Sequence, residues 1–96
     1  MMYKLQGSTV QVSRDEGETY ENIQSRLGNE IKRRWNGSGW QADLLFIQLE
    51  TVPSHWCLHY IGETGKKRYI DVTPKVALKL LSGEVQPVTV AKEEQR

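Results

Sequence analysis

Residues 43–72 have the sequence DLLFIQLETVPSHWCLHYIGETGKKRYIDV, and this stretch decides the fold. Residues 44–49 are almost all apolar, and the run is too short for an independent helix. After a break that contains proline, apolar and more polar side chains alternate along residues 55–60. The turn sequence Gly-Glu-Thr-Gly at 62–65 then leads into a second alternating run, residues 68–72. The stretch therefore predicts a meander of three antiparallel strands.

The first two predicted strands carry apolar side chains on both of their faces. A strand of this kind is typically central in its sheet and is covered on two sides. We therefore expect at least one of the two strands to be central, with helices on one face of the sheet and a partner on the other.

The chain has 96 residues and one cysteine, Cys57. This length allows one domain with a modest core, which we expect to span residues 1–91, followed by a disordered tail at 92–96. A lone cysteine cannot form an intrachain disulfide, and this one lies inside a predicted strand, so we expect a reduced, intracellular protein located in the cytoplasm. No apolar run reaches the ~18 residues of a membrane span, and the first residues lack the apolar centre of a signal peptide.

An N-terminal strand or hairpin is predicted because apolar residues alternate with polar ones around Gly7-Ser8. These apolar residues are Tyr3, Leu5, Val10 and Val12. Because the other face of this segment is polar, we expect it to lie at an edge.

A first helix is predicted from Tyr20 to Trp35. Its apolar residues recur at intervals of three and four: Tyr20, Ile23, Leu27 and Ile31. Thr19 offers a hydroxyl N-cap, and Asn36-Gly37 offers a left-handed exit.

A second helix is predicted directly after the meander. Thr73 is its N-cap, Pro74 its first residue, and Ser82-Gly83 its end. The segment from Val85 to Val90 is expected to be a short edge strand, because Pro87 removes a backbone donor that a central strand would need.

Together these elements predict an α+β domain. Its order is strand, helix, three strands, helix, strand, with an antiparallel sheet and two helices packed on one face. The alternative is a small, strongly curved β-barrel that carries the same helices.

The sequence His55-Trp56-Cys57-Leu58-His59 is the sharpest local signal of chemistry. On a strand, His55, Cys57 and His59 project from one face at ~6.7 Å spacing and could converge on a metal such as zinc. A structural zinc site uses four ligands, and the sequence supplies no second pair. We therefore expect no metal and no cofactor, with Cys57 as a small buried residue. A Cys57 nucleophile would also need an oxyanion donor and a cleft, so we expect no enzymatic activity.

Basic and aromatic residues cluster in two places, near Lys32–Arg34 and near Lys66–Arg68. Residues 22–90 contain nine basic and six acidic side chains, a net charge of +3. Such clusters can bind phosphates by charge and stack bases on indole rings. They can equally complement a helix dipole or keep a hairpin soluble. The candidate residues for binding a partner or nucleic acid are Lys32, Arg33, Arg34, Trp35, Trp40, Lys66, Lys67 and Arg68.

The predicted order of helix, three-strand meander and helix is similar to that of the double-stranded-RNA-binding domain, over residues 20–82. Pro53-Ser54-His55 resembles that family's Pro-x-His, and the resemblance implies a contact from His55 to the minor groove. The second helix opens Thr73-Pro74-Lys75, a single lysine where the family has a cluster for phosphates. The alanine-rich body of that helix is also missing from this sequence.

Three Trp and four Tyr are many aromatic side chains for a core of this size. We therefore predict a small, non-enzymatic binding or regulatory module that acts through a protein partner or as a homodimer. The alternative is a nucleic-acid-binding domain that uses the two basic clusters.

Overall fold

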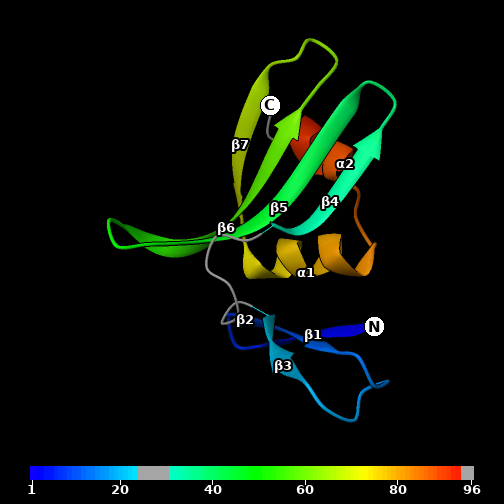
Figure 1. Cartoon of the computed structure of the whole chain (residues 1–96), viewed down its shortest axis with the longest axis vertical. Helices are drawn as coiled ribbons and strands as arrows, with labels where there is room; N and C mark the ends of the chain where they lie inside the picture. The colour runs from blue at the N-terminus through cyan, green and yellow to red at the C-terminus, as the bar shows by residue number, and fades with distance from the viewer. Residues whose placement is uncertain (24–30, 94–96) are drawn as a thin grey trace.

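The computed structural model describes residues 1–23 and 31–93, which form seven strands and two helices. Figure 1 shows them in two sheets, and the class is α+β as predicted. The N-terminal strands are β1 (Met2–Gln6), β2 (Thr9–Ser13) and β3 (Glu21–Asn22). The larger sheet contains β4 (Ile31–Gly37), β5 (Trp40–Leu49), β6 (Val52–Ile61) and β7 (Lys67–Val72). The helices are α1 (Pro74–Ser82) and α2 (Pro87–Glu93).

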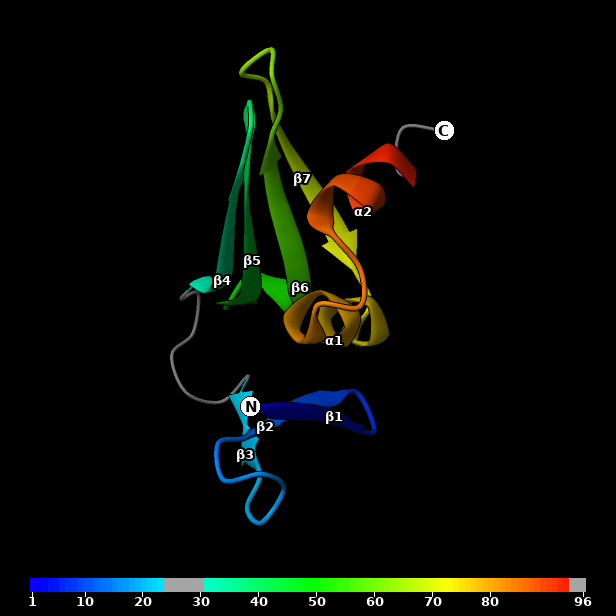
Figure 2. The ribbon, with the colours of Figure 1, turned by 90° about the vertical axis from the view of Figure 1, so that its right-hand side faces the viewer.

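The predicted meander is confirmed as β5, β6 and β7. Together with β4 it forms a four-stranded antiparallel sheet in the order β4-β5-β6-β7. The two strands with apolar side chains on both faces, β5 and β6, are the central ones. Both helices lie on the same side of this sheet (Figure 2). Of the two helices that the sequence predicted on one face, only α1 is present there among the described residues; α2 takes the place of a predicted strand.

The prediction of a helix from Tyr20 to Trp35 is wrong for the part of this range that the structure describes. Glu21–Asn22 pairs with β2, and Ile31–Gly37 pairs with β5; residues 24–30 of the prediction lie outside the described residues. The helical spacing of apolar residues is overridden because strand pairing with β5 satisfies the backbone and packs Trp35 against the core. This correction also removes the first helix on which the similarity to the RNA-binding domain depended.

The glycines that were expected to end this helix instead form the β4–β5 hairpin. Gly37 faces Trp40 across the hairpin, and the left-handed φ of 78° belongs to Gly39. A Cβ atom on Gly37 would lie 2.0 Å from the Trp40 ring, so the indole can lie across this position only because it is glycine.

The N-terminal hairpin is confirmed as β1 and β2, which pair in register around Gly7-Ser8. A tight loop links β2 to β3: Asp15 accepts hydrogen bonds from the Thr19 hydroxyl, the Thr19 amide (2.8 Å) and Ser13 (2.8 Å). These bonds, the Thr19 hydroxyl first, lower the pKa of Asp15 to about 2. Thr19 is thus a donor to Asp15 and not the cap of a helix.

Helix α1 begins and ends as predicted. The Thr73 hydroxyl accepts from the Val76 amide at 3.2 Å, and Gly83 adopts a left-handed φ of 83°.

The edge strand predicted at Val85–Val90 is wrong, because Pro87 opens helix α2. Proline suits a first helical turn, where its missing N–H is not needed. The buried residues Pro87, Val90 and Ala91 have helical spacing. Helix α2 includes Lys92 and Glu93, which were expected in the disordered tail; residues 94–96 lie outside the described residues.

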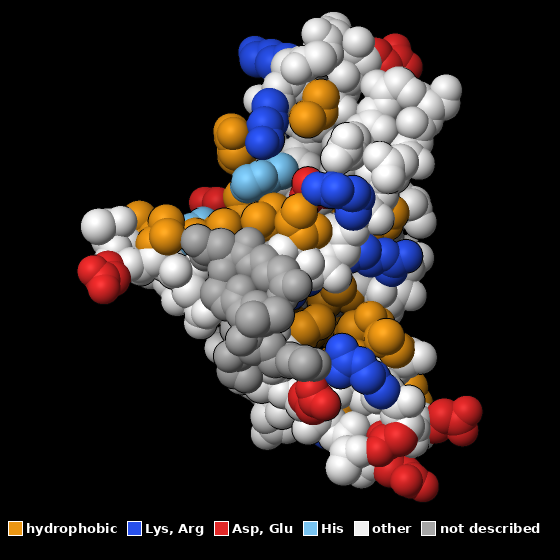
Figure 3. Space-filling model, in the orientation of Figure 1, with side chains coloured by type: hydrophobic (Ala, Val, Ile, Leu, Met, Phe, Trp, Pro, Cys, Tyr) orange, Lys and Arg blue, Asp and Glu red, His pale blue; other side chains and the backbone are white. Residues whose placement is uncertain are grey.

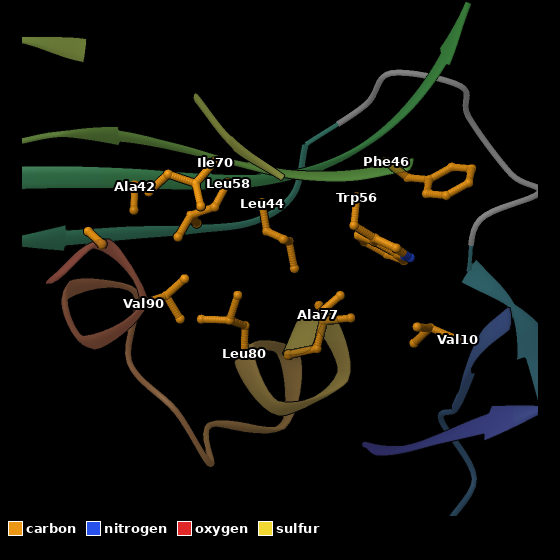
Figure 4. Close-up of a cluster of buried hydrophobic side chains, with 12 residues drawn as sticks. Val10, Ala42, Leu44, Phe46, Trp56, Leu58, Ile70, Ala77, Leu80 and Val90 are labelled. Carbon is orange, nitrogen blue, oxygen red and sulfur yellow. The ribbon is translucent and has the colours of Figure 1, made fainter. Parts of the chain in front are cut away.

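The core forms where α1 lies between the two sheets (Figure 1). Figure 4 shows side chains of the large sheet, α1 and the N-terminal hairpin meeting there. The largest fully buried ones include Trp56, Leu44, Leu58, Leu80 and Val10. Burial of each such aliphatic side chain stabilises the fold by about 1.5–3 kcal/mol. The described strands form two separate open sheets, so the alternative of a closed barrel is not realised.

Removal of the Thr73 cap should lower the free energy of unfolding by about 1 kcal/mol, because the Val76 amide loses its acceptor. Urea unfolding of Thr73→Ala measures this effect, and Thr73→Ser, which keeps the hydroxyl, is the control. A Thr73→Ala variant that is as stable as Thr73→Ser would contradict the role of the cap.

Candidate functional site

The face of the four-stranded sheet opposite α1 and α2 is the main candidate for a functional surface, and we call it the outer face. Strand register places on it alternate residues of each strand. They are Ile31, Arg34 and Asn36 of β4; Gln41, Asp43, Leu45 and Ile47 of β5; His55, Cys57, His59 and Ile61 of β6; and Lys67, Tyr69 and Asp71 of β7. Within residues 1–23 and 31–93, no helix or second sheet packs on this face.

Apolar side chains occupy the middle of the outer face. Leu45 and Ile47 of the central strand β5 are half-buried; toward the two edges, Ile31 of β4 is 40% exposed and Tyr69 of β7 is 64% exposed. In Figure 3, hydrophobic and histidine side chains run across this side of the molecule, between charged groups. A contiguous apolar area with a polar rim is typical of a surface that binds another molecule.

Charged residues of both signs surround this apolar area. Arg34 donates two hydrogen bonds to Asp43, at 2.7 and 3.2 Å, and this pairing raises the pKa of Arg34. On β7, the Lys67 ammonium lies 5.3 Å from the centre of the Tyr69 ring. The rim is therefore mixed in sign and is not a continuous basic track.

Two histidines lie on the outer face. The His59 ring packs against Tyr69 with centroids 4.6 Å apart, and its pKa is lowered by burial first and by Lys67 second. His55 is held by the Pro53 carbonyl at 2.8 Å and lies 3.5 Å from Asp71. His59 is therefore neutral at pH 7 and acts as part of the apolar area.

Cys57 lies between these histidines along β6, on the same face, as predicted. It is buried, and burial first and the nearby Asp71 second raise the pKa of its thiol. A thiol with a raised pKa is a poor nucleophile and a poor metal ligand. Within the described ranges, no three His, Cys, Asp or Glu side chains gather closely enough to hold a metal ion.

Two of the predicted binding residues serve the fold instead. Arg33 of β4 donates to the Leu81 and Leu80 carbonyls at 2.6 and 3.3 Å, at the end of α1. Arg68 of β7 donates to the Ala91 carbonyl at 2.9 Å, in the last turn of α2. Both guanidinium groups donate to carbonyls at a helix end, where the last carbonyl groups have no partner within the helix; the Leu80 carbonyl also accepts from the Gly83 amide at 3.3 Å.

The structure therefore divides the predicted set between the two faces of the sheet. Arg33, Trp35, Trp40 and Arg68 lie on the helix side, whereas Arg34 and Lys67 lie on the outer face. Lys32 sits at the irregular pairing of β4, and Lys66 in the turn before β7. The two clusters lie on opposite edges of the sheet, about 14 Å apart at ~4.8 Å per strand.

Trp35 and Trp40 are half-buried and pack against the core. Trp40 stacks on Tyr60 with centroids 6.0 Å apart, and the Arg33 guanidinium lies 5.0 Å from the Trp35 ring centre. Trp35 and Trp40 thus cover part of the core on the helix side of the sheet. On the outer face, the exposed aromatic residue is Tyr69.

A pocket of about 310 Å³ lies between the β1–β2 turn, β6 and the start of α1. Its walls include Ser8, Phe46, Trp56 and Pro74. The buried Trp56 Nε1 has no hydrogen-bond partner among the described residues. The Trp56 and Phe46 rings pack edge to face, with their centroids 5.2 Å apart and an interplanar angle of 61°. The remaining lining residues of the pocket include Ser54 and His55, so the walls combine apolar and polar side chains.

Sequence reasoning missed the importance of Tyr69. The signal was present in the alternation of Lys67, Tyr69 and Asp71 with Arg68 and Ile70, which assigns the first three residues to one face. The basic residues 66–68 are adjacent in sequence, and this run of charge masks the alternation of residues 67–71 between the two faces.

Comparison with known proteins gives no match to a family model, a curated protein or a solved structure. Neither helix of the described ranges has the length and apolar character needed to cross a membrane.

Arg68→Ala should lower the free energy of unfolding by about 1.5 kcal/mol, because the last turn of α2 loses a charged donor. The control is Lys66→Ala, an exposed neighbour of the same charge, which should change it by less than about 0.5 kcal/mol. Urea unfolding measures both variants. Equal effects would show that Arg68 does not hold α2.

The Cys57 thiol should react slowly with a disulfide reagent such as DTNB at pH 7.5, because it is buried and protonated. The comparison is the same protein in denaturant, in which the thiol should react at the rate of a free cysteine. Rapid reaction of the native protein would restore Cys57 as a candidate nucleophile.

Proposed function

We propose that this chain is a small, non-enzymatic binding module that holds a protein partner on the outer face of its four-stranded sheet. The observation that carries the proposal is the apolar middle of that face, formed by the central strands β5 and β6, which no described helix covers. The half-buried Leu45 and Ile47 gain stabilisation of about 25 cal/mol per Å² when a partner removes their remaining surface from water.

The rim of the outer face supports a protein partner over a nucleic acid. It carries Arg34 with Asp43, and Lys67 with Asp71, so positive and negative groups alternate around the apolar middle. Protein interfaces combine an apolar centre with a polar rim of mixed charge, whereas a phosphate backbone requires positive groups along a track. A buried free thiol also favours an intracellular location for the module.

A photo-reactive benzophenone side chain in place of Ile31 tests this proposal. In a lysate of the native host cells it should form an adduct with a protein, and nuclease treatment should leave that adduct intact. The matched control is the same side chain in place of Met2, which is similarly exposed but lies on the N-terminal sheet. Adducts of equal yield at both positions, or none at position 31, would refute the proposal.

The adduct partner, identified by mass spectrometry and purified, then allows a measurement of affinity. Ile31→Lys should weaken binding about tenfold or more, because it places a charge in an apolar contact. Met2→Lys should leave binding unchanged, although it adds the same charge to an equally exposed site.

Nucleic-acid binding is retained as a second candidate because Lys67 and the exposed Tyr69 lie side by side. Fluorescence anisotropy with labelled single-stranded and duplex oligonucleotides tests it. If it holds, Lys66→Ala with Lys67→Ala should flatten the salt dependence, by about 0.7 per contact for single strands or 0.9 for duplex. Arg68 is left intact in this variant because it holds α2. We expect no micromolar binding at physiological salt.

A further inference from the structure

Strand β7 is an open edge of the four-stranded sheet. It is last in the strand order and pairs with β6 on one side, and no described strand lies on its other side. In Figure 1 it borders the upper part of the molecule on the left. Alternate N–H and C=O groups of β7 therefore point outward and can pair with another strand.

The two edges of this sheet differ in regularity. The pairing of β4 with β5 shifts register between Ile31 and Arg33, whereas β7 pairs with β6 without a shift from Lys67 to Val72. Bulges and prolines protect edge strands from pairing, and β7 contains neither. Of the two edges, β7 is the one suited to accept a further strand.

The charges along β7 are complementary to those of a second, antiparallel copy. Lys67, Tyr69 and Asp71 occupy the outer face at spacings of two residues. If two β7 strands pair about a two-fold axis at Tyr69, each Lys67 faces the Asp71 of the other copy. A shift of two residues places Lys67 opposite Tyr69 or Thr73, and both ion pairs are then lost. The charges therefore select one register.

The side chains needed for this pairing are accessible in the single chain. Tyr69 is 64% exposed, and the side chain of Asp71 is 82% exposed with His55 3.5 Å away. On the other face, Arg68 is bound to the Ala91 carbonyl and Ile70 is buried. Pairing at the edge would thus leave the helix side of β7 unchanged.

We propose that the protein forms a homodimer in which two β7 strands pair antiparallel about Tyr69 and join the two sheets into one. The two-fold axis runs along the sheet normal, so both outer faces lie on the same side and form one wide surface. This inference goes beyond the proposed function, because it concerns the edge of the sheet and not its face. An edge of six residues is a small interface, so the dimer is weak and depends on concentration.

Charge exchange tests the register, with mass measured by sedimentation equilibrium over a concentration series. In a dimer of Lys67→Asp chains, or of Asp71→Lys chains, both facing pairs of residues 67 and 71 carry like charges. Each variant alone should therefore be monomeric at concentrations at which the wild type dimerises. An equimolar mixture of the two variants should regain dimers, because both facing pairs are then complementary. Lys66→Asp, an equal charge change in the turn outside the paired segment, should dimerise as the wild type does.

Disulfide trapping supplies a second test, in a Cys57→Ser background. Tyr69→Cys should form an intermolecular disulfide under mild oxidation, because facing Cα atoms in an antiparallel pair are ~4.5–5.5 Å apart. Lys67→Cys should not, because its two copies would lie about 13 Å apart along the strands. Circular dichroism checks that each variant is folded.

A wild-type protein that stays monomeric near millimolar concentration would overturn the homodimer, as would a mixture that fails to regain dimers. Equal trapping at positions 67 and 69 would overturn the register. None of these results bears on cross-linking at position 31, which lies on the far edge of the sheet, so the two proposals fail independently.

Discussion

Two arginines from the edges of the large sheet hold the helix layer in place, and the open outer face follows from this arrangement. Arg33 of β4 binds the end of α1, and Arg68 of β7 binds the end of α2. Because each guanidinium reaches across to the same side, both helices cover one face and neither covers the other. A charged donor to a helix carbonyl is worth about 1.5–3 kcal/mol, roughly twice a neutral hydrogen bond.

The sequence was informative about the fold where the signal was local. The alternation in residues 43–72 predicted three strands, and Thr73, Pro74 and Gly83 together predicted α1. The segment at Ile31–Gly37 was mispredicted because its strand character depends on pairing with β5, which no window of the sequence contains. The segment around Pro87 was mispredicted because proline fits both an edge strand and the first turn of a helix, and the burial of Val90 and Ala91 at helical spacing decides for the helix.

For the candidate site too, local sequence patterns were informative, whereas contacts between distant residues could not be predicted. The pattern of β5 and β6 indicated a face that needs cover, and the structure has helices on one side only in its described residues. The roles of individual cations could not be predicted, because adjacent residues such as Lys67 and Arg68 point to opposite faces and meet different groups. A run of charged residues along a strand therefore does not form one charged surface. Successive side chains point to opposite faces, so only every second charge shares a surface.

The position of α1 between the two sheets also affects how the chain acquires its structure during synthesis. The β1–β2 hairpin is synthesised before α1, yet Val10 packs against residues of α1. At 5–20 residues per second the hairpin waits roughly 4 to 14 s for that helix. During this interval the apolar side of the hairpin has no native cover, and transiently exposed apolar surface of this kind promotes aggregation.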